Sequence, residues 1–235
     1  ALFAPLEGAS ALGAGQGVEV RRISVNGLEE ATHPRAAERL AWEIRKRTSI
    51  ETTLSPGSVR LDDPSIYRTP FLYWSGGRSF PALSEAEITG LRRFVEYGGF
   101  VLIDDASPEG DGFDESVRRE LVRAFPSERF VRLSPDHTIF RSFYLLSRVV
   151  GRLAEPEYVE AISHAGRVAV LYSRHDLGAA WAFDGRSHQA DDISPGQRET
   201  AVRFGVNVVM YALCLDYKDD QVHAPFILRR RGGRP

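Results

Sequence analysis

The sequence predicts an α/β fold in which a doubly wound, mainly parallel sheet is covered by helices on both faces. Residues 71–74 and 100–103 are continuous apolar runs, which is typical of strands buried on both sides. A helix with one apolar stripe is predicted between them, and strands alternate with helices through the first two thirds of the chain. This alternation favours parallel strands joined by right-handed crossovers.

The N-terminal part supplies two strands and one helix. Residues 18–24 alternate apolar and charged side chains, which predicts a first strand, and Asn26-Gly27 turns the chain. The segment Thr32-His33-Pro34 opens a helix, because proline is tolerated in a first helical turn. We expect its buried side to consist of Leu40, Ile44 and Trp42. Residues 58–61 are a short second strand.

Capping signals locate the later helices. Ser84 and Glu87 have the spacing of a capping box, and Gly98-Gly99 supplies the left-handed residue that ends this helix. A third helix ends at Pro126, with a predicted apolar side of Val117, Leu121, Val122 and Phe125. Ser194 and Gln197 form a second capping box. It opens a long terminal helix whose apolar residues are Phe204, Val208, Val209, Ala212 and Leu213.

The pattern changes after the third helix. Residues 130–133 predict another strand. Residues 158–163 and 167–173, joined by His164-Ala165-Gly166, predict a C-terminal β-hairpin. Residues 179–183 are predicted to continue this hairpin.

Composition limits the domain organisation and the partners. The 235 residues suit one domain, and we expect a flexible leader at 1–16, a single α/β domain at 17–216 and a C-terminal extension at 217–235. A net charge of -2 gives no reason to expect a nucleic-acid partner. No stretch reaches the roughly 20 apolar residues of a membrane-spanning helix.

Two further features concern location and redox chemistry. The N-terminal Ala-Leu-Phe-Ala-Pro sequence is typical of a mature end left by signal-peptide cleavage, which predicts a periplasmic or otherwise exported protein. An artificially trimmed chain and a cytoplasmic location are the alternatives. The single cysteine, Cys214, excludes an internal disulfide and a cysteine-based metal site, and we expect it to pack as a small apolar residue.

Four predicted strand ends carry candidate site residues. In a doubly wound sheet, ligands bind at the carboxyl ends of the strands. Because neighbouring strand residues point to opposite faces, we expect only one of Asp104 and Asp105 to face a shared pocket. The candidate ligand-binding residues are Ser75, Gly76, Gly77, Asp104, Asp105, Asp136, His137, Arg174, His175 and Asp176.

Three kinds of site fit these residues: a hydrogen-bonded structural cluster, a site for a non-metal ligand, or a divalent-metal site built from Asp105, His137 and His175. No pair has a compact metal-ligand spacing, so no cofactor is predicted and a divalent metal is the remaining option. Ser75-Gly76-Gly77 could present backbone N–H groups to an anion or simply allow a tight turn. The chain has neither a dinucleotide-binding glycine pattern nor a P-loop.

Several sequence segments together resemble a bacterial domain family of unknown function whose fold is similar to that of class I glutamine amidotransferases. These segments are residues 71–77, 91–99, 102–105, 136–140, 176–178 and 205–212. The resemblance extends from about residue 18 to about residue 228. It implies a flavodoxin-like, amidotransferase-like sheet and frequent export or membrane association, but no established activity.

The resemblance also argues against one activity. The amidotransferases place a nucleophilic cysteine on the turn after a central strand, whereas the matching turn here is Ile103-Asp104-Asp105-Ala106. Cysteine-dependent glutamine hydrolysis is therefore not expected.

Three hypotheses for function follow. The leading hypothesis is a non-catalytic binding module of the cell envelope for a small polar ligand or a protein partner. The second is a hydrolase that uses Asp105, Asp136, His137 and His175 around a metal or a water molecule. The third is a scaffold that docks through residues 217–231, which contain Val222, Pro225, Phe226 and Ile227 and no predicted element.

Overall fold

The computed structural model describes the backbone of residues 17–107, 109–110, 112–182 and 193–231, and the side chains of these ranges as far as Cys214. Seven strands form one sheet. Only β6 runs antiparallel to its neighbours, so the sheet is mainly parallel, as predicted. In spatial order the strands are β2 (Ser58–Val59), β1 (Arg21–Ile23), β3 (Phe71–Gly76), β4 (Phe100–Asp105), β7 (Arg167–Ser173), β6 (Glu160–His164) and β5 (Val131–Arg132).

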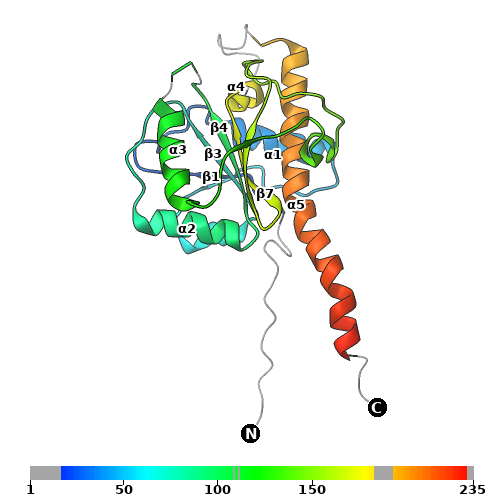
Figure 1. Cartoon of the computed structure of the whole chain (residues 1–235). Coiled ribbons are helices and arrows are strands. Elements are labelled where there is room, and N and C mark those ends of the chain that lie inside the picture. The colour runs from blue at the N-terminus through cyan, green and yellow to red at the C-terminus, as the bar shows by residue number, and fades with distance from the viewer. Residues whose placement is uncertain (1–16, 108, 111, 183–192, 232–235) are drawn as a thin grey trace.

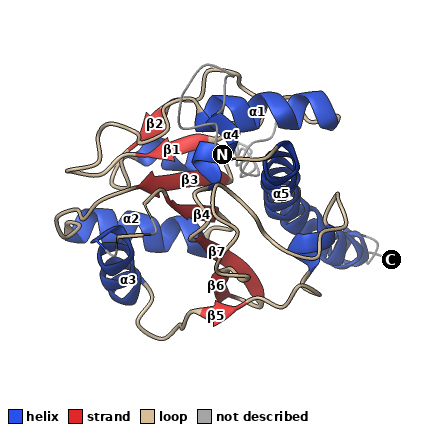
Figure 2. Ribbon diagram, turned by 90° about the horizontal axis from the view of Figure 1, so that it is seen from above, coloured by secondary structure: helices blue, strands red, loops and turns tan. Residues whose placement is uncertain are grey.

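Helices cover both faces of the sheet. The two layers are plain in Figure 2, which looks down onto one edge of the sheet, with α2 and α3 on one side and α1, α4 and α5 on the other. One layer contains α1 (Ala36–Arg47), the 3-10 helix η2 (Thr138–Arg141), α4 (Leu177–Ala182) and α5 (Pro195–Arg231). The other contains η1 (Pro64–Arg68), α2 (Glu85–Glu96) and α3 (Gly112–Ala124).

The two central strands form the middle of the core, as their apolar runs predict. Side chains alternate between the faces, so Phe71 and Tyr73 of β3 pack beneath α1 and α5, whereas Leu72 and Trp74 pack beneath α2 and α3. All six residues of β4 are buried. Each residue buried in this way removes apolar surface from water, which is the main stabilising contribution to the fold.

The predicted helix ends are confirmed. Ser84 Oγ accepts the Glu87 N–H at 3.2 Å, and Glu87 Oε2 accepts the Ser84 N–H at 2.9 Å. The Ser194 and Gln197 pair repeats this arrangement at the start of α5. Gly98 has a φ of 101°, a left-handed conformation that lets the chain leave α2 and enter β4.

The predicted hairpin forms and joins the main sheet. β6 and β7 pair antiparallel, and their turn has φ values of 50° at Ala165 and 80° at Gly166, the two left-handed residues of a type I′ turn. β7 then pairs parallel with β4. The hairpin therefore supplies a central strand rather than an appendage.

Some boundaries differ from the predictions. β1 and β2 are shorter than residues 18–24 and 58–61, and Val18 makes only an isolated bridge with Thr52. Helix α1 begins at Ala36 rather than at Thr32. The prediction that residues 179–183 extend the hairpin is wrong, because Leu177–Ala182 form helix α4; Phe183 lies outside the described residues.

Three side chains expected to be buried face solvent. Val122 is 64% exposed, because the buried side of α3 is formed by Val117, Leu121 and Ala124. Trp42 is 36% exposed, and its ring lies between the cationic groups of Arg39 and Lys46. Cys214 is exposed on α5 rather than packed in the core.

The backbone of residues 217–231, expected to have no element, continues α5 to Arg231 and extends past the body of the molecule (Figure 1). The side chains of this segment, including the apolar residues of the docking hypothesis, lie outside the described residues. No helix among the described residues combines the length and the apolar character needed to cross a membrane. The predicted leader, residues 1–16, is also outside the described range.

Candidate functional site

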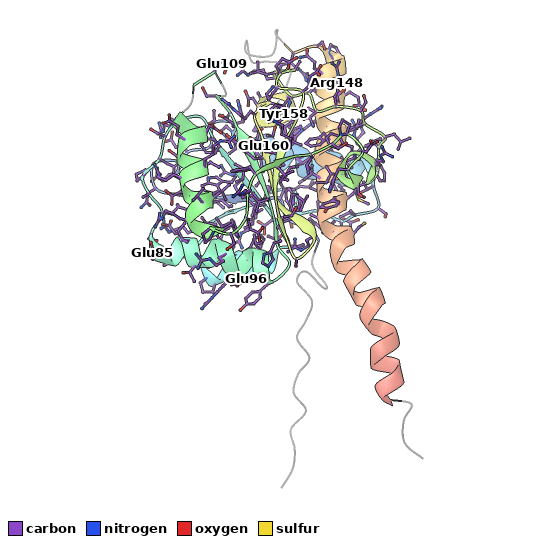
Figure 3. The ribbon with its side chains drawn as sticks, in the orientation of Figure 1. Glu85, Glu96, Glu109, Arg148, Tyr158 and Glu160 are labelled. Atoms are coloured by element: carbon purple, nitrogen blue, oxygen red, sulfur yellow. The ribbon has the colours of Figure 1, made fainter. Side chains whose placement is uncertain are left out.

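The carboxyl ends of β3, β4 and β7 meet at one edge of the sheet. In the strand register, Ser75 lies beside Asp104, Gly76 lies beside Asp105, and Asp104 lies beside Ser173. Figure 3 shows this edge uppermost, with Glu109 of the loop after β4 near it and Glu96 at the opposite end of the molecule. The sequence-based expectation that these three strand ends converge is confirmed; we call this edge the carboxyl edge.

Asp104 points into the layer of α1, α4 and α5. Its Oδ1 accepts the Leu177 N–H at 3.0 Å, and its Oδ2 accepts the Gly178 N–H at 2.8 Å and the Tyr73 hydroxyl at 3.1 Å. The carboxyl group is fully buried and lies near Asp176, and both effects raise its pKa to about 7. Asp104 thus fixes the first turn of α4 against the end of β3.

Asp176 joins three segments that are far apart in the sequence. Its Oδ1 lies 2.8 Å from Nε2 of His33, and its Oδ2 accepts Nε–H of Arg152 at 2.6 Å. Arg152 also binds both carboxylate oxygens of Glu109, at 3.0 and 3.1 Å. The backbone of Asp176 has a φ of 51°, a left-handed conformation that aspartate tolerates better than most residues.

Asp105 points to the opposite face, as its position next to Asp104 predicts. Its Oδ1 accepts the Ser107 N–H at 3.0 Å, and its Oδ2 lies 3.5 Å from the Tyr172 hydroxyl and 3.7 Å from Arg174 Nε. Burial is the largest influence and raises its pKa to about 6. Asp105 closes the turn after β4, which is a structural role.

His175 is fully buried beneath the segment before β6. Its Nε2 lies 2.6 Å from the Pro156 carbonyl, which can only accept, so Nε2 carries the proton and Nδ1 accepts the Ser173 hydroxyl at 3.1 Å. Burial lowers the pKa of His175 to about 4. The imidazole is therefore neutral near pH 7, and both of its nitrogens hold neighbouring segments in place.

Asp136 and His137 do not reach the carboxyl edge, contrary to prediction. They follow β5, an edge strand that is separated from β7 by β6. The His137 ring contacts Tyr211, whose ring also contacts Phe100 at the amino end of β4. His137 caps η2 through Nδ1, and Asp136 forms an exposed ion pair with Arg141.

The proposed metal ligands are therefore not brought together. Asp105 lies at the carboxyl end of β4, His175 is enclosed beside Pro156, and His137 lies near the amino ends of the central strands. Among the described residues, no group of three or more histidine, cysteine, aspartate or glutamate side chains has an arrangement that could hold a metal ion.

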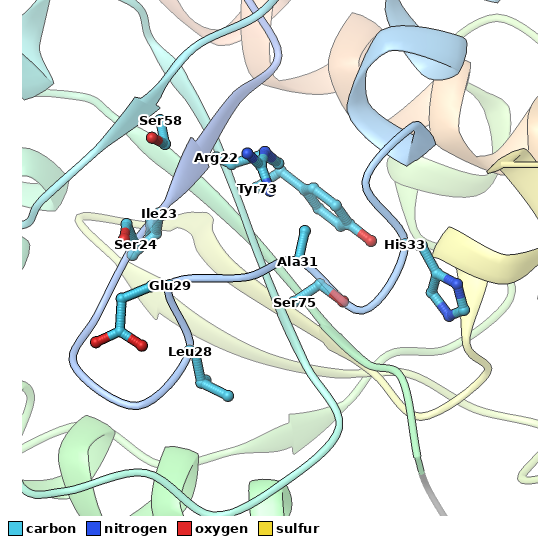
Figure 4. A pocket seen from close by; sticks show the side chains of 10 residues that line it. All are labelled: Arg22, Ile23, Ser24, Leu28, Glu29, Ala31, His33, Ser58, Tyr73 and Ser75. Atoms are coloured by element: carbon cyan, nitrogen blue, oxygen red, sulfur yellow. The ribbon is translucent and has the colours of Figure 1, made fainter.

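A pocket opens at the carboxyl edge beside β1 and β3 (Figure 4). The space in it that a water molecule can occupy is about 20 Å³, and loop residues 28–33 form one of its walls. The strand register explains its polar floor, because Arg22 lies between Ser58 and Tyr73 on the face covered by α1. The polar lining consists of Arg22, Ser24, Glu29, His33, Ser58 and Ser75, together with the Tyr73 ring.

The family of the chain follows from a comparison with known domains. A family model described as "Domain of unknown function (DUF4159)" matches residues 19–213. The chain belongs to this family. No curated protein matches the sequence. The DUF4159 match confirms the expected membership in a domain family of unknown function and covers every strand and helix that builds the carboxyl edge.

The glycines of the predicted Ser75-Gly76-Gly77 turn serve two purposes in this DUF4159 domain. A Cβ on Gly76 would lie 2.5 Å from the Phe113 ring, so Gly76 allows close packing of α3. Gly77 lines a second, more open pocket of about 370 Å³ with Thr32 and Ser107. Ser75 and Gly77 therefore face separate pockets, with loop residues 28–32 between them.

Sequence reasoning missed Arg22, His33 and Arg152 as site residues. His33 was assigned only to a helix start, and Arg152 falls in a segment without a repeating pattern. One usable signal was present in the first strand. Alternate residues of a strand share a face, so Arg22 lies on the same face as Val20 and Ser24. Val20 is buried on the face covered by α1, and this places Arg22 beside it on that face.

The sole cysteine is remote from the carboxyl edge. Cys214 follows Tyr211 by three residues on α5, and Tyr211 packs against the amino ends of the central strands. The turn after β4 carries Asp104 and Asp105 instead, and both are bound to backbone N–H groups. Cys214 is therefore at the wrong end of the DUF4159 domain to act with these residues.

Proposed function

We propose that the domain is a binding module for a small polar ligand, held in the pocket formed by β1, β2, β3 and loop residues 28–33. The observation that supports this most is the pocket itself. Its hydroxyl, guanidinium and imidazole groups come from separate segments but lie around one small pocket. A concave site with a few convergent polar groups is the usual form of a small-molecule site.

A binding role fits the chemistry of the neighbouring residues better than cysteine-type catalysis does. Asp104, Asp105 and His175 are all engaged in hydrogen bonds that hold turns and helix ends. The mainly parallel sheet and the two aspartates after its central strand support an amidotransferase-like domain in which the nucleophile is replaced. On this proposal the domain binds its ligand at the carboxyl edge of the sheet but has no cysteine nucleophile there.

Blocking the pocket tests the proposal. Ala31 lines the pocket from the loop, and Ala31→Phe should fill part of it. The control is Ala86→Phe, which places the same side chain on the exposed surface of α2. In a ligand-observed NMR screen of small polar molecules, we expect hits that bind the wild type and Ala86→Phe but not Ala31→Phe. A screen without hits, or hits that bind all three proteins equally, would contradict the proposal.

A second candidate is a hydrolase, and one contact favours it. His33 lines the same pocket and its Nε2 lies 2.8 Å from Asp176, an arrangement in which a carboxylate orients an imidazole for proton transfer. This pair replaces the Asp105, Asp136, His137 and His175 set that the sequence suggested.

Enzyme assays with simple esters and phosphate esters separate the two candidates. Activity that is present in the wild type and in His137→Gln but lost in His33→Gln would favour the hydrolase. Turnover that survives in His33→Gln, or no turnover at all, would leave binding as the function.

A further inference from the structure

Arg22 differs from its neighbour Arg21 in what it contacts. The two side chains point to opposite faces of β1. Arg21 donates through Nη1 to the Ser65 carbonyl at 2.7 Å and lies 3.9 Å from Glu19. Arg22 is half-buried and lines the pocket, and its side chain makes neither a hydrogen bond nor an ion pair with the described residues. A partly desolvated guanidinium of this kind gains most from an anionic partner.

The polar groups that flank Arg22 on this face of the sheet are hydroxyls. Register places Ser58 and Tyr73 on either side of Arg22, and Ser24 and Ser75 follow on the same face. Ser75 Oγ is buried and makes no well-formed hydrogen bond with the described residues. It lies close enough to the Tyr73 hydroxyl to lower the pKa of Tyr73, but burial has the larger effect and raises that pKa. The serine hydroxyls can donate to ligand oxygens that the guanidinium does not bind, whereas Tyr73 donates its one proton to Asp104.

Among the described residues, Glu29 is the one acidic side chain that lines this pocket, and its carboxylate already accepts a backbone N–H. Its Oε1 accepts the Gly27 N–H at 2.9 Å, and this bond lowers the pKa of Glu29. In Figure 4 its carboxylate points away from Arg22 and Tyr73. The Arg22 end of the pocket therefore keeps its positive charge.

We infer that the pocket recognises the oxyanion of a small molecule, a carboxylate or a phosphate, with Arg22 as the anchor and the serine hydroxyls as supporting donors. This inference rests on the proposed binding function and names the class of its ligand. The planar fork of arginine matches two oxygens of either group, whereas a lysine would act as a point charge. The pocket has only about 20 Å³ of space that a water molecule can occupy, so only a small group such as an oxyanion can enter it.

The test is an NMR titration of the ¹⁵N-labelled protein with inorganic phosphate and, separately, with propionate, at constant ionic strength set by sodium chloride. Arg22→Gln removes the anchor. The control Arg45→Gln removes an exposed arginine whose pair with Glu51 lies outside the pocket. We expect at least one anion to shift the amides of residues 22–33 and 73–75. Its affinity should fall about tenfold or more in Arg22→Gln and stay unchanged in Arg45→Gln.

The two anions distinguish the two ligand chemistries, since a phosphate site should prefer phosphate and a carboxylate site propionate. If Arg22→Gln does not fold, Arg22→Lys should still weaken binding, because it keeps the charge and loses the fork. Equal anion binding by the wild type and Arg22→Gln would mean an adventitious ion only and would overturn the inference. If neutral molecules bind in the pocket and neither anion does, the inference fails while the binding function stands. If nothing binds there, both fail.

Discussion

Nε2 of His33 lies 2.8 Å from Oδ1 of Asp176, although 143 residues separate the two in the sequence. This contact joins the loop before α1 to the start of α4. It also sets one wall of the pocket, because His33 is a lining residue. The geometry of the proposed site therefore depends on a buried carboxylate that does not itself line the pocket.

Asp176→Ala should lower the free energy of unfolding by about 2–3 kcal/mol, because the His33 ring and Nε–H of the partly buried Arg152 both lose their partner. Urea denaturation measures this loss. The control is Asp136→Ala, whose exposed pair with Arg141 should contribute less than about 0.5 kcal/mol. A loss in Asp176→Ala as small as that of the control would mean that the His33 contact contributes little.

Asp104→Asn should cost about 1–3 kcal/mol, because the amide can accept only one of the two N–H groups of α4 that the carboxyl group binds. Asp63→Asn is a matched control, since Asp63 also accepts a backbone N–H, from Ser65 at 2.7 Å, but at an exposed helix start. We expect the loss in thermal stability to be clearly smaller for Asp63→Asn. Equal losses would show that burial adds nothing to the role of Asp104.

His175 should make stability depend on pH. Its folded pKa of about 4 lies below the ordinary histidine value, so the unfolded chain binds more protons between about pH 4 and 6.5. Its contribution is therefore complete above about pH 6.5 and is lost as the pH falls, by up to about 1.4 kcal/mol per pH unit.

The raised pKa values of Asp104 and Asp105 act in the opposite sense, because they lower stability as the pH rises from about 4 towards 7. The informative quantity is consequently the difference between wild type and His175→Gln, measured by denaturation at several pH values. This difference should shrink towards pH 4. A difference that is constant with pH would contradict the buried, neutral state of His175.

The fold was predictable where local patterns and burial agree. The apolar runs of β3 and β4, the two capping boxes and the turn at Gly98 were all located from sequence. The prediction that residues 179–183 extend the hairpin is wrong for residues 179–182, because a short apolar run fits a strand or a helix equally well. Its helical state depends on Asp104 and Asp176, which accept N–H groups of the first turn of α4.

The site was only partly predictable. Three strand ends converge as expected, but His137 packs against Tyr211 near the amino ends of the central strands, and no local pattern in the sequence records this long-range contact. His33 was overlooked because its partner Asp176 is 143 residues away, and no local pattern records such a contact.

Gly178→Ala should disturb the carboxyl edge directly. A Cβ at this position would lie 2.7 Å from the Tyr73 hydroxyl and 3.1 Å from Cδ2 of His33, so these side chains must move. We expect a loss of about 1–3 kcal/mol and shifted NMR signals of the His33 ring. Gly196→Ala, in the first turn of α5, meets no atom closer than 4.0 Å and should be nearly neutral. Unchanged His33 signals in Gly178→Ala would show that the edge is not tightly packed.

We expect ligands to bind beside His33 at the carboxyl edge. The most direct measurement is the amide shift map of the ¹⁵N-labelled protein with a molecule found in the small-molecule screen. The largest shifts should fall on residues 22–33, 58 and 73–75. Largest shifts around residues 135–147, or along α2, would place the binding surface elsewhere and contradict it.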